Sequence, residues 1–290
     1  MTGRLARLVP DWAAGARAED TAYLVRLFYG ALLAIGLGTI YEMGTSLRVF
    51  MTDSQILLWP AWWARREGPG FAVPFVSVLL AVGAFAGALW PGRRWARVLA
   101  CVGLWEYVAV LASYANLFPV YNQWAAVAFV FIFLPDRWDE PGAAERDREA
   151  ASLVVWAALA LFLLTYSMAG LSKFLMGVWQ ASRGELTVFG AAGAKRLFQV
   201  YQSESGHLGP LGSVMMQEPA LYAPLHLAVT LVQLAALAAA WRPSWHRAAG
   251  AGVIAFHAAT FLMLGIFFKQ SALLAALLLL GSPFVNAKRD

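Results

Sequence analysis

Long apolar runs, separated by short polar segments, alternate along the whole chain. Most of these runs hold about 20 residues, which is the length that an α-helix needs to cross the hydrocarbon core of a bilayer. The pattern predicts a bundle of about eight transmembrane helices, at residues 21–42, 71–90, 97–118, 120–134, 151–176, 221–241, 248–268 and 271–285. We therefore expect an all-α integral membrane protein that forms one polytopic transmembrane domain over residues 1–290.

Residues 179–219 break this pattern, because polar, glycine and apolar residues alternate there without a long apolar run. Such a segment is typical of helices that lie at the membrane surface or dip into it. We expect one or two interfacial or re-entrant helices between the fifth and sixth spans.

Composition supports a membrane protein. Hydrophobic residues make up 60% of the chain and charged residues only 13%, whereas about a quarter of the residues in a soluble domain are charged. A net charge of +5 would suggest nucleic acid as the partner of a soluble protein. Here the basic residues lie between apolar spans, so we interpret them as topology signals and expect membrane lipids, and no nucleic acid, as partners.

The distribution of Lys and Arg predicts the orientation. With eight spans, the two termini and the even-numbered loops share one side of the membrane, and they hold most of the Lys and Arg residues. Because cytoplasmic segments are enriched in these residues, both termini are expected in the cytoplasm and residues 179–219 outside. The alanine- and arginine-rich composition suggests a bacterial inner membrane.

Lys173 is the most informative ionisable residue, since it lies within the fifth span near its outer end. Charged groups inside a span are costly and often functional. A lysine amine surrounded by apolar residues is a usable base or nucleophile. The alternative is that the side chain extends to the interface and only anchors the helix.

Three further polar residues inside the apolar runs have competing interpretations. His257, in the middle of the seventh span, is able to relay a proton or hold a ligand, but a lone membrane histidine also often makes a helix–helix hydrogen bond. Glu106 is expected to pair with Arg26 from the first span. Asn122 lies at the hairpin before the fourth span, where a turn residue and a ligand residue are both conceivable. The four histidines are scattered, so no metal site is predicted.

Five stretches, in order along the chain, resemble the transmembrane domain that vitamin K-dependent gamma-carboxylases share with bacterial horizontally transferred transmembrane (HTTM) domain proteins. They are residues 23–30 with an arginine, 50–58, the hairpin 121–124, 169–174 followed by Trp179 and Gly184, and 256–257 with 264–267 and 282–283. The fourth is similar to the family pattern in which an Ala-Gly pair precedes the lysine by three to four residues.

The resemblance implies a membrane-embedded enzyme that binds reduced vitamin K or another isoprenoid quinol. In the carboxylases the lysine of that pattern is the base that deprotonates the quinol, and the match places this role on Lys173. It also places His257 in the catalytic cavity, with Asn122, Tyr166 and Trp179 as cofactor-binding residues. The reaction would modify a peptide or lipid on the extracytoplasmic side.

Two departures from the family keep other functions open. The carboxylases carry a large extracytoplasmic domain after the helices, whereas this chain ends at Asp290, and the segment after the fourth span lacks their histidine. We expect a separate protein on the outer side to supply substrate recognition. The alternatives are a non-catalytic component of a peptide maturation or export system, and a carrier of lipids or small molecules.

Overall fold

The computed structural model describes residues 10–46, 61–114, 121–266 and 268–285, and these residues form helices and turns with no β-strand. The expected all-α fold is therefore confirmed for this part of the chain. The stretch 50–58 and the connection 115–120 between the third and fourth predicted spans lie outside the described residues.

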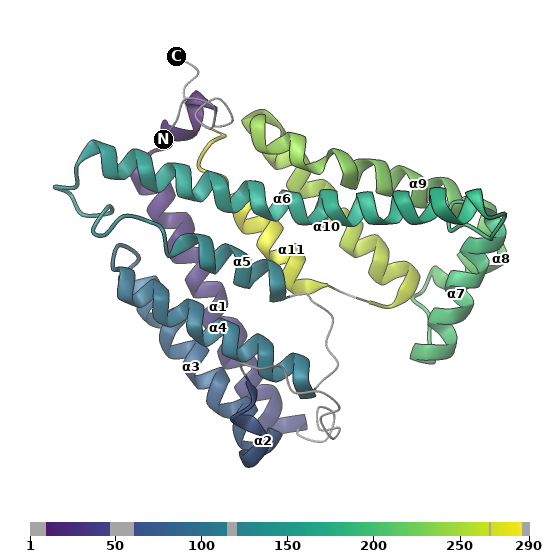
Figure 1. Ribbon diagram of the computed structural model, residues 1–290, viewed down its shortest axis with the longest axis horizontal. Helices are drawn as coiled ribbons and strands as arrows, with labels where there is room; N and C mark the ends of the chain where they lie inside the picture. Colours follow the sequence, from purple (N-terminus) through teal and green to yellow (C-terminus); the bar gives the residue numbers. More distant parts are fainter. Residues whose placement is uncertain (1–9, 47–60, 115–120, 267, 286–290) are drawn as a thin grey trace. The chain divides into compact units, whose positions relative to one another are not determined.

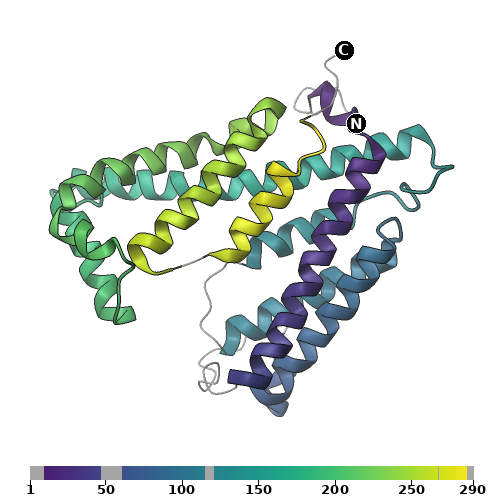
Figure 2. The ribbon, with the colours of Figure 1, turned by 180° about the vertical axis from the view of Figure 1, so that it is seen from behind.

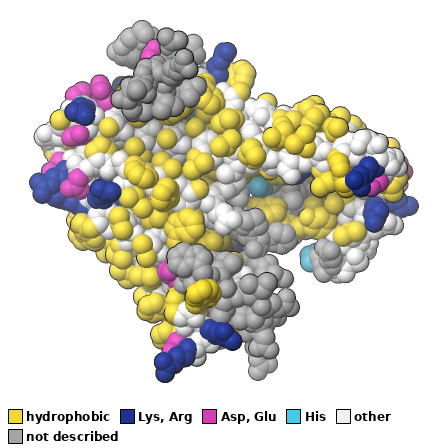
Figure 3. Space-filling model, in the orientation of Figure 1, with side chains coloured by type: hydrophobic (Ala, Val, Ile, Leu, Met, Phe, Trp, Pro, Cys, Tyr) yellow, Lys and Arg dark blue, Asp and Glu magenta, His cyan; other side chains and the backbone are white. Residues whose placement is uncertain are grey.

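Six helical segments are long and apolar enough to cross a membrane, which indicates an integral membrane protein. They are Ala18–Glu42, Pro69–Leu89, Arg94–Ser113, Glu145–Ser182, Pro219–Trp241 and Pro243–Leu264. Hydrophobic side chains predominate on the surface shown in Figure 3, with Lys and Arg confined to a few clusters. The helix α3 (Pro69–Leu89) exposes a stripe of apolar side chains at helical spacing: Phe71, Phe75, Val78, Val82, Phe85 and Leu89.

The two remaining predicted spans are shorter than expected, so eight full spans are not confirmed. The span predicted at 120–134 contains α5 (Asn122–Phe131), a helix of 10 residues. The span predicted at 271–285 overlaps α11 (Lys269–Ala275) and η7 (Ala276–Leu280), of 7 and 5 residues. At a rise of 1.5 Å per residue these helices measure about 15 to 18 Å, against roughly 30 Å for a hydrocarbon core.

The chain divides into two compact units, residues 1–159 with 281–290 and residues 160–280. The first unit contains six described helices and the beginning of a seventh, α6 (Figure 1). The six are η2 (Asp11–Ala14), α1 (Ala18–Ser46), α2 (Ala64–Glu67), α3 (Pro69–Leu89), α4 (Arg94–Tyr114) and α5 (Asn122–Phe131).

Small residues let α1, α3 and α4 pack closely in the first unit. A Cβ added at Gly83 of α3 would lie 2.7 Å from the Cα of Ala100 in α4, and one at Gly36 of α1 would lie 3.1 Å from the Ser77 carbonyl oxygen in α3. The contact at Gly83 therefore requires glycine, and the contact at Gly36 favours it. α3 consequently lies between α1 and α4.

Through α5 the chain returns to the N-terminal end of α4. The Arg94 amide donates a hydrogen bond to Asp136 Oδ1 at 3.1 Å, and the Arg137 amide donates to the Gly92 carbonyl at 2.7 Å. The turn before α4 and the loop after α5 therefore lie at the same end of the first unit.

The second unit contains the C-terminal part of α6 (Glu145–Ser182) and the helices that follow it (Figure 2). These are α7 (Ala191–Ser205), α8 (Gly212–Gln217), α9 (Pro219–Ala235), η5 (Ala236–Trp241), η6 (Pro243–Trp245), α10 (His246–Leu264), α11 (Lys269–Ala275) and η7 (Ala276–Leu280). Two helices, α7 and α8, thus occupy the segment 179–219. Their position relative to a membrane remains a prediction.

A hydrophobic cluster holds α7 and α8 against the ends of α9 and α10. Its buried members are Ala194, Phe198 and Tyr222, with leucine and methionine side chains packed around them. α9 and α10 diverge from the turn that joins them (Figure 1), and η7 runs back along α10, since Leu279 and Leu280 lie against Gly250.

Candidate functional site

Lys173 points from α6 towards α9 and α10 within the second unit. Its Nζ donates a hydrogen bond to Gln233 Oε1 at 2.9 Å and lies 5.4 Å from the centre of the Phe256 ring. α6 and α9 come this close because Gly170 of α6 has no side chain. A Cβ there would lie 2.6 Å from the Leu234 amide nitrogen of α9. The amine is therefore held by a neutral partner inside the unit, and it does not extend away from the helices.

His257 is joined to α6 by a short hydrogen bond. Its Nε2 lies 2.7 Å from the Tyr166 hydroxyl, and the side chain is only 5% exposed. The rings of Phe256 and Phe268 flank the imidazole at 5.0 and 5.5 Å. His257 Nδ1 is buried and has no hydrogen-bond partner among the described residues.

The partners of both residues line one apolar pocket of about 420 Å³ between α6, α9 and α10. Gln233 and Tyr166 are its polar members. The others are apolar or glycine: Leu163, Leu225, Ala228, Val229, Val232, Ala236, Ala248, Ala249, Gly252, Val253, Ala255, Phe256 and Ala259. The α10 wall consists mainly of small residues, which leaves space between the two diverging helices.

The pocket borders the outer surface of the second unit. Leu225 and Val232 line it and are 50% and 66% exposed. Exposed apolar residues on a membrane protein face lipid. A lipid-soluble molecule could therefore enter the pocket sideways, from the hydrocarbon layer.

Ser167 stabilises an irregularity in the helix that carries Gln233. α9 changes to 3-10 geometry at Ala236. There the Ser167 hydroxyl lies 3.1 Å from the carbonyl oxygens of Gln233 and Leu234 and accepts a hydrogen bond from the Leu237 amide at 2.9 Å. Since backbone groups inside a membrane need partners from the protein, Ser167 fixes the backbone from which Gln233 reaches Lys173.

A second histidine belongs to the same region, although its spacing in the sequence did not single it out. His226 Nδ1 lies 2.9 Å from the Tyr222 hydroxyl, and its ring packs against Phe189 at 5.7 Å. The second unit therefore holds two Tyr–His pairs, Tyr166–His257 and Tyr222–His226.

Gln233 and Ser167 were also missed by the sequence analysis. A glutamine inside an apolar run carries a weak signal, because membrane glutamines commonly make helix–helix hydrogen bonds. The approach of α6 to α9 at Gly170 is what gives this glutamine a lysine as its partner.

Trp179 and Asn122 lie outside this pocket. The Trp179 indole is 47% exposed, and the guanidinium of Arg183 lies over it at 4.2 Å, an arrangement that suits a membrane–water interface. Asn122 is exposed and begins α5 in the first unit. Their role in cofactor binding stays a prediction.

The expected pair between Glu106 and Arg26 is wrong. Arg26 instead forms an ion pair with Asp139 at 3.4 Å. Glu106 Oε2 accepts a hydrogen bond from the Trp63 indole at 3.0 Å. Asp139 and Glu106 are far in sequence from Arg26 and Trp63, so tertiary packing decides these two contacts.

Comparison of the chain with protein-family models, with curated proteins and with solved structures found no match. Among the described residues, no group of three or more His, Cys, Asp or Glu side chains is arranged to hold a metal ion. The amine of Lys173, its partners and the apolar pocket are the features of the described residues that indicate a function.

Proposed function

We propose that the protein is a membrane-embedded enzyme that binds an isoprenoid quinol and uses Lys173 as a base, to modify a peptide or lipid on the extracytoplasmic side. The observation that carries this proposal is the position of Gln233, which holds the Lys173 amine at 2.9 Å and lines the apolar pocket. The resemblance to the gamma-carboxylase transmembrane domain points to the same lysine.

The pocket suits a molecule with a small polar head and an apolar tail. Ligand pockets usually measure about 300 to 1,000 Å³, and this one measures about 420 Å³. Its polar groups, Tyr166 and Gln233, come from α6 and α9, while the small residues of α10 leave space for a hydrocarbon chain. Val232 and Leu225 mark the side on which a long isoprenoid tail would leave the pocket.

Each polar residue at the pocket would have its own role. As a neutral amine, Lys173 donates one hydrogen to Gln233 Oε1 and keeps its lone pair for the proton of a bound hydroxyl. Gln233 orients the amine, and Tyr166 and His257 provide a short hydrogen-bonded pair at the same pocket. A bound quinol would supply an acidic hydroxyl and two reducing equivalents.

We also infer that the chain crosses the membrane eight times, with both termini in the cytoplasm. α5 and the segment Lys269–Leu280 would make short crossings, because each runs back along the helix before it. The C-terminal end of α6, with Lys173 and the helices α7 and α8, would then face the extracytoplasmic side. α7 and α8 would lie at that surface.

The cofactor proposal is tested first by filling the pocket. Gly252 lines it, and a Cβ at this position meets no atom within 4 Å. Gly252→Leu should therefore fold normally and yet exclude the tail. Gly38→Leu is the matched control, since Gly38 is also helical, in α1, and also borders open space.

The measurement is mass spectrometry of organic extracts from the purified proteins. We expect stoichiometric quinone in the wild type and in Gly38→Leu, and a loss of about tenfold in Gly252→Leu. A wild-type protein without quinone, or equal amounts in all three proteins, would exclude the pocket as the cofactor site.

The role of the amine is tested by the absorbance of an added short-chain naphthoquinol under anaerobic conditions. Deprotonation of the quinol shifts its spectrum. We expect the shift with the wild type and not with Lys173→Ala or Lys173→Met, even where these variants bind the quinol. An unchanged shift in both variants would assign the base to another residue.

The sideways opening of the pocket is also what a carrier of lipids or small molecules would need. A carrier predicts counterflow of its substrate across proteoliposomes, which the enzyme does not. Counterflow that persists in Lys173→Ala would favour the carrier.

A further inference from the structure

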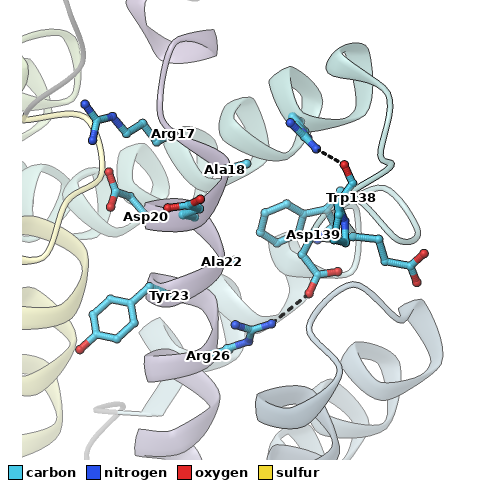
Figure 4. Close-up of a pocket in the computed structure, with 12 residues that line it drawn as sticks. Arg17, Ala18, Asp20, Ala22, Tyr23, Arg26, Trp138 and Asp139 are labelled. Carbon is cyan, nitrogen blue, oxygen red and sulfur yellow. Dashed lines mark hydrogen bonds and ion pairs between the residues drawn. The ribbon is translucent and has the colours of Figure 1, made fainter.

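Charged side chains border a cavity of about 900 Å³ in the first unit, but they do not converge on one point (Figure 4). Arg17 and Asp20 extend to the side of α1 opposite Trp138 (Figure 4). Arg26 is already paired with Asp139 at 3.4 Å. The polar residues of the second unit, in contrast, line up along one contact between two helices.

α9 carries a stripe of polar residues inside an apolar segment. His226, Thr230 and Gln233 are spaced by four and three residues, so they share one face of the helix. The residues between them are all leucine, alanine or valine. Thr230 is fully buried, Gln233 is 6% exposed and His226 is half-buried. The polar face of α9 is therefore turned into the unit.

The face of α6 that meets this stripe contains Gly170, Lys173 and Gly177, which are spaced by three and four residues. Gly170 and Lys173 contact the segment around Gln233. α9 begins near the end of α6 and runs back along it (Figure 1), so the next turn of α6, at Gly177, lies towards His226. This contact, the polar seam, is formed by Lys173, Gly177, His226, Thr230 and Gln233.

Phe189, from the loop between α6 and α7, closes the seam at its Gly177 end. A Cβ added at Gly177 would overlap the Phe189 ring, so the ring needs glycine to lie this close to α6. The ring also packs against the His226 imidazole, with 5.7 Å between the ring centres. A hydrogen bond of 2.9 Å between the Tyr222 hydroxyl and Nδ1 holds that imidazole. Residues 183–186 of the same loop are exposed, so one aromatic ring separates the seam from an exposed segment.

A base needs a way to return the proton that it takes. If Lys173 removes a proton from a bound hydroxyl, the resulting ammonium has to pass that proton on before the next turnover. The apolar pocket opens towards hydrocarbon, where a charge is strongly disfavoured. The seam is the polar alternative, and the His226 imidazole has one nitrogen that donates and one that accepts.

We propose that the polar seam connects the Lys173 amine to water at the C-terminal end of α6, and that the Phe189 ring opens and closes this route. The ammonium of Lys173 releases its proton to water along the seam and becomes a neutral amine again, while the cofactor enters from the lipid side. The purpose of the route rests on the proposed function, but the route itself is tested without a cofactor.

The test is the rate at which Lys173 is acylated in the purified full chain in lipid nanodiscs. Two N-hydroxysuccinimide esters are compared. The sulfonated acetate ester is charged and stays in water, whereas the palmitate ester dissolves in the lipid. Mass spectrometry of peptides measures the modification of Lys173, with the exposed Lys195 as the reference for reactivity in water.

Phe189→Ala removes the gate. We expect it to raise the rate of Lys173 modification by the sulfonated ester about tenfold, because the open route changes from a minor to a substantial population. The rate with the palmitate ester and the rate at Lys195 should stay at their wild-type values. Leu186→Ala is the matched control, since Leu186 belongs to the same loop and is 54% exposed, and it should change none of these rates.

Two further variants complete the design. Gly177→Ala displaces the Phe189 ring from α6, so it should act in the same direction as Phe189→Ala and serves as the test if that variant does not fold. Gly252→Leu fills the apolar pocket and should slow only the palmitate ester. A purified protein without quinone would contradict the proposed function but would not alter these rates, so the two failures are distinguishable.

Equal rates with the sulfonated ester in the wild type, Phe189→Ala and Gly177→Ala would overturn the gate. A wild-type Lys173 that reacts with this ester as fast as Lys195 would overturn it too, because the route would then be open already. The same holds if Phe189→Ala speeds both esters equally, since that result means a general loosening of the helices.

Discussion

Arg97 is a buried cation whose hydrogen-bond partners, among the described residues, are all backbone carbonyls. Its side chain has no exposed surface. It donates to the Pro91 carbonyl at 2.6 Å, to the Leu134 carbonyl, and to the Pro135 carbonyl at 3.4 Å. One guanidinium thus joins the turn before α4 to the loop after α5, and its five fixed donors make arginine suited to this task.

We expect Arg97→Ala to lower the stability of the protein by about 3 kcal/mol, because buried carbonyls then lose their donor. Arg97→Lys should recover only part of this loss, since one ammonium cannot span both segments in the same geometry. Thermal unfolding in detergent measures both. Arg94→Ala is the control, because Arg94 is exposed and its contact to Asp136 uses the backbone amide. Equal midpoints for Arg97→Ala and Arg94→Ala would show that the carbonyls find water or other donors.

At the scale of the element, the crossing of α6 and α9 decides whether the site exists. Ser167, Gly170 and Lys173 lie one turn apart on α6, and each of them faces the region around Gln233 of α9. Residues spaced by three lie on the same face of a helix, so these three side chains share one face of α6. The glycine provides the close approach, the serine holds the irregular backbone, and the lysine donates a hydrogen bond to the amide oxygen of Gln233.

Gly170→Ala should separate the two helices, because the new Cβ would lie 2.6 Å from the Leu234 backbone nitrogen. We expect a destabilisation of about 1 to 3 kcal/mol, typical of overpacking, measured as a lower unfolding temperature in detergent. Gly30→Ala in α1 is the matched control, since its Cβ meets no atom within 4 Å. That variant should be neutral or slightly more stable, because alanine favours helix. If both variants unfold at the wild-type temperature, α6 and α9 are free to adjust their distance.

At the scale of the whole molecule, α6 is the element that sets the sidedness of the site. It has 38 residues and measures about 57 Å at 1.5 Å per residue, which is well beyond the thickness of a hydrocarbon core. Arg146 and Arg148 lie in its first turns, and Lys173 lies near its C-terminal end. Charge in the loops and the length of this helix together predict that Lys173 faces the outer side.

Cysteine labelling with a membrane-impermeant maleimide tests this orientation. In a Cys101→Ser background, which removes the one native cysteine, Gly142→Cys should be labelled only from the cytoplasmic side. Glu185→Cys should be labelled only from the opposite side. Both positions are exposed, and α6 is the helix between them. Labelling of both from one side would mean that α6 does not cross, and a reversed pattern would place the site in the cytoplasm.

The apolar runs alone determined that this is a helical membrane protein, because a chain with so few charges and runs of about 20 apolar residues has to bury its backbone polar groups in helices within lipid. They also located the six long spans and drew attention to Lys173 and His257, since an ionisable group inside such a run needs a structural or chemical reason. Local composition contains this information, so no tertiary contact was required.

The tertiary structure decided everything that depends on which helices are neighbours. It gave Lys173 a glutamine partner, gave His257 a tyrosine partner, and replaced the expected Glu106–Arg26 pair by two other contacts. Helix periodicity shows which residues share a face, but not which helix that face meets. Close contacts at Gly83 and Gly170 select those neighbours, and the effect of a missing Cβ becomes visible only when the second helix is in place.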